Sequence, residues 1–490
     1  SFVKNETFEV VSLPKDKKPL TTRWVFRIKE NDGGPRKFKA RLVVRGCSQV
    51  EGADYHETFS PVVKYSSLRF LIALAVQENL NIDHLDVKTA YLYGDLGEEI
   101  YVRPPPELLN PAEGKVWRLR KAIYGLKQAG RCWNAKICSV LKKMKFKKSE
   151  ADPCIFRRLD GNDIAIIALY VDDLILITSN DDQKAMIKNH LEREFEMQDL
   201  GEVQHCVGMD IRRDRKAGKL WINQEKYIVE ILKKFRMDES RPVSTPMEQN
   251  TKLLVVDHEE DPDFKPEQIP YQEAIGSLLY VSQMSRPDLV FAVNTLSRFN
   301  NNFRKVHWVA VKRIFRYLNG TRKMSLEYSR SETFDLNIFC DADWGNELTG
   351  RHSISGNCAK IGNCLLSWLS KKQNSIALSS CEAEYVSLSI GVQETIWFRQ
   401  LISEFIPILK KTPTKVFCDN LGAIQVAKND IVNQKSKHID IRYHFIKNHV
   451  KNGKIVVENV PTDQMLADIF TKPLGKIKHL EFLTLLNLKL

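Results

Sequence analysis

The sequence IAIIALYVDDLILIT, residues 164–178, largely decides how this chain folds. Two apolar runs, 164–169 and 174–178, flank Asp172 and Asp173 and predict two buried strands joined by a tight turn. Asp is a favoured turn residue, so a plain hairpin turn is one explanation of this pair. Adjacent carboxylates also repel each other, and divalent cations remove that repulsion. The second explanation is therefore a metal site.

A second acidic segment and a basic run support the metal site. In the segment His84–Tyr91, Asp86 lies at the end of another apolar strand. Residues 127–149 contain eight Lys and Arg residues and no acid. Such a run is usually a solvated face, but between two candidate metal segments it would also neutralise a phosphate backbone. Two Mg²⁺ ions about 4 Å apart stabilise the attacking and leaving oxygens of a phosphoryl displacement, so the pattern predicts chemistry on a polyanion.

The C-terminal part repeats this logic with other acids. An alternating apolar strand at 336–340 ends at Asp341, and a second apolar strand at 416–418 ends at Asp419. Acids at strand ends can converge over one edge of a sheet, so we expect these two to share a site. Asp343, close to Asp341, is expected to be a loop acid or a supporting one.

Two further acids open a long helix predicted from Cys381 to about Phe405. Ser379 and Glu382 have the spacing of a capping box, in which the Glu side chain bonds back to the start of the helix. Glu384 has no such role and can reach the strand ends. We therefore interpret Glu382 as a cap and Glu384 as a metal ligand.

Length and composition limit the class of protein. The chain has 490 residues, with 43% hydrophobic and 28% charged residues, which suits a globular chain of about three domains. Lys and Arg number 74 against 61 Asp and Glu, a net charge of +13 that favours an anionic partner. No apolar run is long enough to span a bilayer, and no signal peptide is evident. The first residue is Ser, which suggests a fragment of a longer protein.

Cysteine usage points to a reducing compartment. The ten Cys residues are scattered and form no C-x-x-C pair, so neither a disulfide framework nor a zinc ribbon is indicated. Residues 251–270 are rich in acids and proline, which predicts a linker or surface loop. A softer boundary lies at 329–333. The pattern predicts an α+β chain in three parts, with divisions near 250 and 330.

Several motifs occur in an order that resembles the reverse transcriptase of copia-type LTR retrotransposons. They are RLVVRG at 41–46, ETFSPV at 57–62, LDVKTAY at 85–91, AIYGLKQ at 122–128 and YVDD at 170–173. The resemblance implies a right-hand polymerase with fingers, palm and thumb in residues 1–250. It also implies that Asp86 and Asp172 are the main catalytic metal ligands, with Asp173 supporting them.

The same resemblance implies contacts to substrate. Tyr91 would lie under the sugar of the incoming nucleotide and exclude a 2′-hydroxyl, which selects deoxynucleotides. Gln128 would touch the nucleotide or the template, while Lys39 and Arg41 would reach the triphosphate. For these last three residues a surface cation or an ordinary helix-start Gln is the alternative. Residues 221–235 would belong to the thumb.

The C-terminal motifs resemble the ribonuclease H of the same elements. They are CDADW at 340–344, EAEY at 382–385, CDN at 418–420, KHIDIRYHF at 437–445 and LADIFTKPL at 466–474. The resemblance implies a ribonuclease H-like α/β domain at 331–490, joined by a linker and connection at 251–330. Catalytic metal ligation would fall to Asp341, Glu384, Asp419 and Asp468. His438 and His444 would contact nucleic acid or assist proton transfer, with a structural role equally open.

Together these resemblances imply a retrotransposon enzyme with two activities. It would copy RNA into DNA and cleave the RNA of RNA–DNA hybrids, with two Mg²⁺ per active site and Mn²⁺ as a substitute. Its partners would be an RNA template, a DNA primer, the hybrid, deoxynucleoside triphosphates and other parts of a Gag-Pol polyprotein, without a membrane. The expected location is intracellular, in a cytoplasmic virus-like particle or the nucleus. The alternatives are a decayed or domesticated nucleic-acid-binding protein without catalysis, and a structural subunit of a heterodimer.

Overall fold

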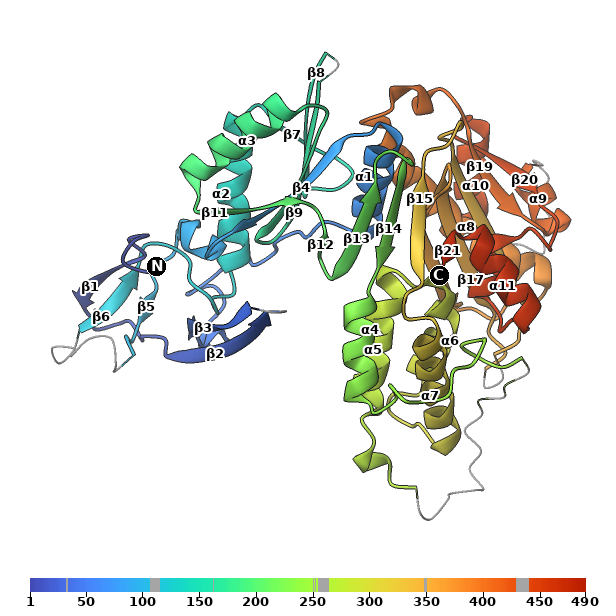
Figure 1. The fold of residues 1–490 in the computed structure, drawn as a ribbon, viewed down its shortest axis with the longest axis horizontal. Coiled ribbons are helices and arrows are strands. Elements are labelled where there is room, and N and C mark those ends of the chain that lie inside the picture. Colours follow the sequence, from blue (N-terminus) through green and yellow to red (C-terminus); the bar gives the residue numbers. More distant parts are fainter. Residues whose placement is uncertain are drawn as a thin grey trace. The chain divides into compact units, whose positions relative to one another are not determined.

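The computed structural model of this protein combines helices and sheets, as the sequence predicts (Figure 1). It describes residues 1–31, 34–105, 115–161, 163–249, 251, 253, 264–347, 350–428 and 440–490. The chain forms two compact units. The first consists of Ser1–Val63 and Asn81–Val203, and the second of Lys64–Leu80 and Gln204–Leu490. Among the helices of the described residues, none has the length and apolar character needed to span a bilayer.

The first unit is centred on a six-stranded sheet in the order β11-β4-β10-β9-β8-β7. The strands are β4 (Asn81–Val87), β7 (Lys147–Lys148), β8 (Ile155–Asp160), β9 (Asp163–Tyr170), β10 (Asp173–Thr178) and β11 (Met197–Glu202). The β9–β10 hairpin confirms the predicted strand pair, and its aliphatic residues are almost completely buried. Helix α3 (Asp181–Glu194) packs on β10. Burial on both faces explains why these strands read as continuous apolar runs.

Two smaller sheets complete the first unit. Strands β2 (Thr22–Asn31) and β3 (Gly34–Val44) pair antiparallel. Strands β1 (Phe8–Ser12), β6 (Lys115–Leu119) and β5 (Tyr101–Val102) form the other sheet. Gly125 joins this region to the end of β3. Its φ is +97°, and a Cβ there would lie 2.1 Å from the Val44 carbonyl oxygen, so the motif at 122–128 requires glycine.

The second unit contains a helical core and an adjoining five-stranded sheet. The helices are α4 (Glu225–Lys234), α5 (Tyr271–Met284), α6 (Val290–Ser297) and α7 (Lys305–Gly320), and their apolar faces form one core. The sheet has the order β12-β13-β14-β15-β21. Its strands are β12 (His205–Cys206), β13 (Met209–Asp214), β14 (Lys219–Asn223), β15 (Ser325–Ser329) and β21 (Leu488–Lys489). The last strand of the chain therefore pairs with a strand that lies before the predicted C-terminal domain.

The C-terminal sheet of the second unit has the order β18-β17-β16-β19-β20. Its strands are β16 (Leu336–Asp343), β17 (Ile354–Ile361), β18 (Cys364–Lys372), β19 (Thr414–Cys418) and β20 (Ile455–Asn459). The first three are antiparallel, whereas β19 runs parallel to β16 and β20 runs parallel to β19. Helix α8 (Ser380–Ser403) packs across β16, β17 and β19. A Cβ on Gly391 would lie 2.2 Å from Cys340 Sγ, so this glycine permits the close approach of α8.

Shorter elements pack against the same sheet or against its neighbours. They are α9 (Leu421–Lys428), α10 (Asp440–Lys451), a 3-10 helix at Leu466–Phe470 and α11 (Lys476–Leu485). A Cβ on Gly356 of β17 would lie 2.8 Å from the Ala467 carbonyl oxygen. The 3-10 helix therefore lies directly against β17, which brings the LADIFTKPL motif to the sheet.

The compact units do not follow the predicted divisions at 250 and 330. Helix α1 (Tyr65–Gln77) belongs to the second unit although its sequence precedes the hairpin. Its buried Arg69 donates to the Leu366 carbonyl oxygen at 2.7 Å and stacks on Trp368 at 3.9 Å. Most of the predicted linker, residues 252 and 254–263, lies outside the described residues. The functional division into three parts stays a prediction.

Candidate active sites

The β9–β10 turn places the first group of acids at one end of the central sheet. In the antiparallel register, Asp173 lies opposite Asp86 on β4. The Val87 backbone N–H donates to the Asp172 carbonyl oxygen at 2.9 Å. Val171 has φ +57°, a conformation that β-branched residues rarely adopt, and Trp133 Nε1 donates to its carbonyl oxygen at 2.6 Å. The turn is therefore held from two sides, and the three predicted acids become neighbours.

The surroundings of these acids differ from one to the next. Burial raises the pKa of Asp172, and the charges of Asp173 and Asp86 raise it further, while Arg41 opposes the shift. Asp173 is bonded to His84, with 2.7 Å between Oδ1 and Nε2. All three acids are half-buried. Asp173 therefore has a protein partner that orients it, and the pKa of Asp172 responds to the charges of both other acids.

An aromatic pair lies beside Asp172. The rings of Tyr91 and Tyr124 have centroids 4.9 Å apart, and the Arg41 guanidinium lies 5.6 Å from the Tyr124 centroid. Burial and then the charge of Asp172 raise the pKa of both tyrosines. The structure thus gathers Tyr91 and Arg41 around the hairpin acids. Lys39 is half-buried on the same strand as Arg41 and, two residues away, is on the same face.

Gln128 is placed differently from the expectation. It is only 1% exposed, and its Nε2 donates to the Asp54 carbonyl oxygen at 2.8 Å. Its Oε1 accepts from Gln49 Nε2 at 3.0 Å, and Gln49 Oε1 in turn accepts from the Lys127 backbone N–H at 2.8 Å. These bonds indicate that Gln128 holds two loops together. Its predicted contact with nucleotide or template stays a prediction.

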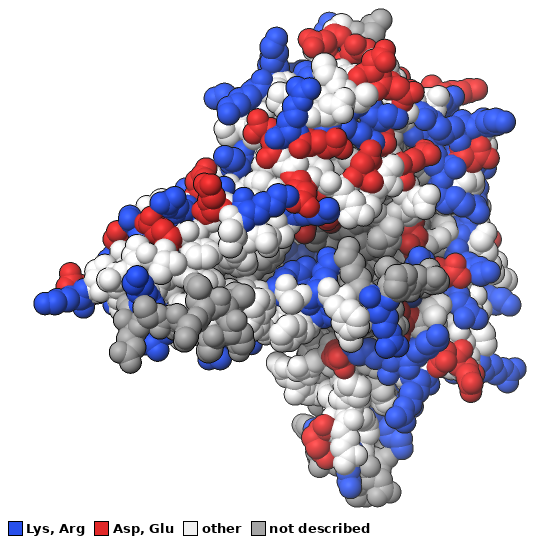
Figure 2. All heavy atoms as spheres, turned by 60° about the vertical axis from the view of Figure 1, so that its left-hand side comes forward, with Lys and Arg blue, Asp and Glu red and all other residues white. Residues whose placement is uncertain are grey.

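The basic run at 127–149 lies on the surface of α2 (Ala129–Lys143) and β7. Seven of its eight cations are exposed, and the eighth, Lys136, is half-buried with its Nζ 3.6 Å from Asp95 Oδ2. Lys127 is the partner of Tyr55, with 2.9 Å between Nζ and the phenol oxygen. Lys and Arg side chains also spread widely over the face drawn in Figure 2, with Asp and Glu among them. Both interpretations of the run, a solvated face and a phosphate-binding face, are compatible with this exposure.

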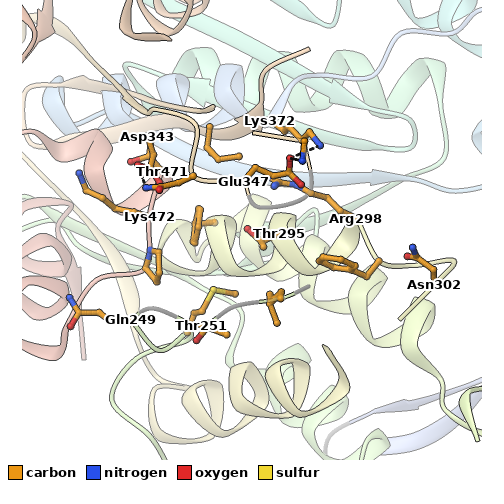
Figure 3. A pocket seen from close by; sticks show the side chains of 18 residues that line it. Gln249, Thr251, Thr295, Arg298, Asn302, Asp343, Glu347, Lys372, Thr471 and Lys472 are labelled. Atoms are coloured by element: carbon orange, nitrogen blue, oxygen red, sulfur yellow. Dashed lines mark hydrogen bonds and ion pairs between the residues drawn. The ribbon is translucent and has the colours of Figure 1, made fainter. Parts of the chain in front are cut away.

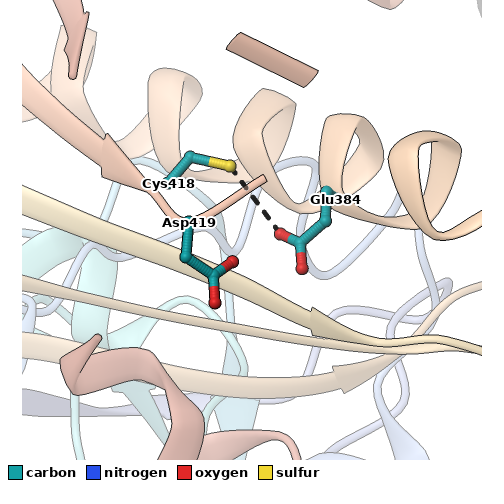
Figure 4. Close-up of side chains that lie close together, drawn as sticks. All are labelled: Glu384, Cys418 and Asp419. Atoms are coloured by element: carbon teal, nitrogen blue, oxygen red, sulfur yellow. Dashed lines mark hydrogen bonds between the residues drawn. The ribbon is translucent and has the colours of Figure 1, made fainter. Parts of the chain in front are cut away.

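The C-terminal acids meet at the carboxyl ends of two parallel strands. The last aligned residues of β16 and β19 are Phe339 and Phe417, so Asp341 and Asp419 each follow two residues later. Glu384 reaches them from the first turns of α8. The ligand atoms of Glu384, Cys418 and Asp419 all lie within 4.8 Å of one another (Figure 4). In the described part of the chain, no other three His, Cys, Asp or Glu residues meet this criterion.

Asp341 and Asp468 are buried beside this group and have protein partners. Asp341 is 3% exposed, and Thr471 Oγ1 donates to its carboxylate. Asp468 is fully buried, with Lys472 Nζ 2.8 Å from Oδ1 and Lys478 Nζ 2.6 Å from Oδ2. The sequence reasoning missed these three partners. Thr471 and Lys472 could have been found, because they follow Asp468 directly in the motif, whereas Lys478 on α11 gave no signal.

The charges at this site are strongly coupled. Burial raises the pKa of Asp341, and the charge of Asp468 raises it further. Burial also raises the pKa of Glu384, followed by the charges of Asp341 and Asp419. The buried Cys418 thiol has a raised pKa as well, so it stays protonated, and its Sγ lies 3.9 Å from Glu384 Oε2. The atoms available to bind a metal ion are therefore carboxylate oxygens, which suit Mg²⁺.

The structure describes most of the remaining predicted residues. The Glu382 backbone N–H donates to Ser379 Oγ at 3.2 Å, and its carboxylate accepts from the Leu378 N–H at 2.7 Å. Its capping role is confirmed, although its partner amide precedes the N-cap by one residue. Asp343 is half-buried and accepts from Asn346 at 2.6 Å. His444 is exposed on α10, and His438 lies outside the described residues.

The chain is similar to known proteins over most of its length. The family model "Reverse transcriptase (RNA-dependent DNA polymerase)" matches residues 5–249. The chain is 40% identical to the retrovirus-related Pol polyprotein from transposon TNT 1-94 of Nicotiana tabacum, over 98% of this chain and 36% of that protein. It is 32% identical to the putative transposon Ty5-1 protein of Saccharomyces cerevisiae, over 63% of this chain and 100% of that protein.

A solved structure of a foamy viral protease-reverse transcriptase in complex with double-stranded DNA also matches. The match covers 97% of this chain and 70% of that one, at 10% identity and a TM-score of 0.23. A likeness at this level supports no conclusion about function. The chain spans about a third of the length of the Nicotiana relative, which extends beyond the matched region.

Proposed function

Because the chain belongs to the reverse transcriptase family of copia-type retrotransposon Pol polyproteins, we propose that it is an RNA-directed DNA polymerase that also cleaves the RNA of RNA–DNA hybrids. One observation carries the first activity: Asp86, Asp172 and Asp173 are neighbours in the register of the central sheet. In this proposal residues 1–250 form fingers, palm and thumb, 251–330 the linker and connection, and 331–490 the ribonuclease H-like domain.

In the polymerase step, the primer 3′-hydroxyl attacks the α-phosphate of a deoxynucleoside triphosphate. Asp86 and Asp172 would hold two Mg²⁺ ions, or Mn²⁺ as a substitute, and the ions would neutralise charge on the reacting phosphate. Asp173, oriented by His84, supports this pair. Arg41, with Lys39 on the same strand, binds the triphosphate. The Tyr91 ring occupies the space under the sugar and disfavours a 2′-hydroxyl.

In the ribonuclease step, water attacks a phosphodiester of the RNA strand. Asp341, Glu384, Asp419 and Asp468 would hold the ions of this second site, and their mutual repulsion supports this assignment because a divalent cation relieves it. Thr471 keeps the Asp341 carboxylate in place. The A-form shape and the 2′-hydroxyls of the RNA strand supply selectivity.

The test is one assay of both activities on the full chain. An RNA template annealed to a labelled DNA primer is incubated with deoxynucleoside triphosphates and Mg²⁺, and primer extension and RNA fragments are followed together. We expect both products, and neither in the presence of EDTA. A soluble protein that binds the hybrid but makes neither product would instead be a decayed or domesticated nucleic-acid-binding protein.

The family also supports a cellular setting for this activity. The relatives are Pol polyproteins, so we place the chain beside other parts of a Gag-Pol polyprotein, in an intracellular, cytoplasmic virus-like particle or in the nucleus. Fractionation of cells that express the whole element would test this location. Recovery of the protein with membranes after a high-salt wash would contradict it.

A further inference from the structure

A pocket of about 730 Å³ lies within the second unit, next to the C-terminal acids (Figure 3). One wall comes from α6 and the residues that follow it, including Phe291, Arg298 and Phe299. The opposite wall comes from the end of β16 and the segment after the 3-10 helix, including Asp343 and Lys472. The proposed chemistry at Asp341 and Asp419 does not by itself account for this space.

The pocket contains a cation that lacks a complete set of partners. Arg298 Nη2 is buried and has no hydrogen-bond partner among the described residues, and the same holds for Thr295 Oγ1 in the same wall. Glu347 is the acid whose charge acts on Arg298. That carboxylate already accepts from the Gly350 N–H at 2.8 Å and lies 3.2 Å from Lys372 Nζ. Arg298 therefore lines the pocket with a guanidinium whose hydrogen-bonding capacity the protein does not fill.

Apolar and aromatic side chains form part of the wall, beside polar and acidic ones that include Asp343 and Glu347. Phe291 and Phe299 are half-buried, pack on the helical core and also line the pocket. Met247 and Pro473 add apolar surface. A guanidinium next to aromatic faces is the combination that binds a phosphate and an attached base, because the base stacks while the phosphate takes the charge.

The pocket is also continuous with the candidate ribonuclease site. Thr471 and Lys472 line it, and they are the residues that bind Asp341 and Asp468. We propose that the pocket binds one nucleotide of the nucleic-acid strand engaged at the C-terminal acids, with its phosphate at Arg298 and its base against Phe291 and Phe299. This inference rests on the proposed ribonuclease function and assigns a strand-binding site to it.

The test measures binding without turnover. The full chain binds a labelled RNA–DNA hybrid in EDTA, and fluorescence anisotropy is recorded over a range of salt concentrations. We expect Arg298→Gln to weaken binding roughly tenfold and to lower the slope of log affinity against log salt by about one, as for the loss of one phosphate contact. Arg298→Lys should lie between. Arg322→Gln, an exposed arginine in the turn after α7, is the matched control and should bind as the wild type does.

The outcomes distinguish failure of this inference from failure of the proposed ribonuclease function. If Arg298→Gln binds the hybrid with wild-type affinity and salt slope, the pocket does not hold the strand, even when wild-type protein cleaves RNA. If wild-type protein does not bind hybrid, both ideas are wrong. Free adenosine monophosphate is added as a competitor. Its binding to wild type but not to Arg298→Gln, with hybrid affinity equal in both, would assign the pocket to free nucleotides and overturn strand binding.

Discussion

The hairpin site and the C-terminal site hold their acids in contrasting surroundings. Asp86 and Asp172 are half-buried at the end of an antiparallel hairpin, and Arg41 is the cation whose charge acts on Asp172. Glu384 is 5% exposed and Asp468 is fully buried, because α8 and the 3-10 helix cover the ends of the parallel strands. Two acid clusters of similar composition can thus differ in how much their charge costs the fold.

This difference teaches where stability and function are coupled. A half-buried carboxylate keeps part of its hydration. The charges of the hairpin acids therefore destabilise the fold less than those of fully buried acids. Burial and neighbouring acids raise the pKa of Asp341 and Glu384, and Lys472 and Lys478 offset part of the cost of the acidic charge by pairing with Asp468. We therefore expect metal ions and pH to affect the stability of the C-terminal region more than that of the hairpin.

The largest expected effect separates the two sites by chemistry. Asp172→Asn should lower primer extension by at least about a thousandfold, because a neutral amide no longer holds charge at the reacting phosphate, and should leave RNA cleavage largely intact. Asp419→Asn should do the reverse. Both rates are measured on one hybrid with each purified variant. Loss of both activities in a folded single variant would mean that the two sites are not independent.

The second prediction concerns a buried ion pair that connects to the C-terminal site. Arg286 and Asp288 are fully buried, with 2.7 Å between Nη2 and Oδ2, and Tyr317 links Asp288 to His479 on α11. Arg286→Met leaves the Asp288 carboxylate without its cation, so it should reduce the free energy of unfolding by roughly 3–5 kcal/mol. Urea unfolding measures this change.

The Arg286→Met substitution should affect the activities of the two sites unequally. His479 is next to Lys478, which pairs with Asp468, so Arg286→Met should impair RNA cleavage more than primer extension. Arg118→Gln, which removes exposed pairs with Glu9 and Glu99, is the control and should not shift the unfolding midpoint. Equal midpoints for Arg286→Met and wild type would show that the buried pair adds no stability.

The third prediction uses pH and Mg²⁺. Burial and neighbouring acids raise the pKa of Asp341 to about 7 and that of Glu384 to about 9. The folded chain therefore holds protons that the unfolded chain has lost, and in EDTA its stability should fall as pH rises from about 5 to 9, by roughly several kcal/mol. Mg²⁺ binds the ionised acids and should restore this loss at high pH.

Thermal unfolding in EDTA and in Mg²⁺ at several pH values checks this expectation. Wild type at high pH should gain a few degrees with Mg²⁺. Asp419→Asn should gain less, whereas Asp172→Asn should gain about as much as wild type. If Mg²⁺ raised the unfolding temperature of both variants by the same reduced amount, the two sites would not differ in how metal binding affects stability.

The smallest expected effect concerns substrate choice at the hairpin site. Tyr91 packs against Tyr124 beside Asp172, and replacing its ring with the methyl group of Tyr91→Ala opens space near the sugar. Ribonucleotide incorporation should rise roughly ten- to a hundredfold relative to deoxynucleotide incorporation, which corresponds to about 1–3 kcal/mol of lost discrimination. Competing incorporation of the two substrates measures it. Tyr124→Phe keeps the ring and serves as the control; unchanged selectivity in Tyr91→Ala would exclude the assignment.

Local structure was largely predictable from the sequence. The hairpin at 164–178, the long helix at 380–403 and the cap at Ser379 and Glu382 follow from short-range patterns, and the structure confirms them. Gln128 shows what local sequence could not predict, because nothing in its surrounding sequence indicates that Gln49 and Asp54 enclose it. Helix α1 shows it again, since its partner Leu366 is almost three hundred residues away in the chain.

The sequence by itself determined which acids exist, the strand ends that carry them and the family to which they belong. Only the tertiary structure decided how deeply each acid is buried and which cation faces it. Asp468 and Asp86 look alike as single letters, yet one is enclosed with Lys472 and Lys478 and the other is half exposed. Burial depends on elements far apart in the chain, and burial sets the energy of a charge; a local pattern therefore cannot contain it.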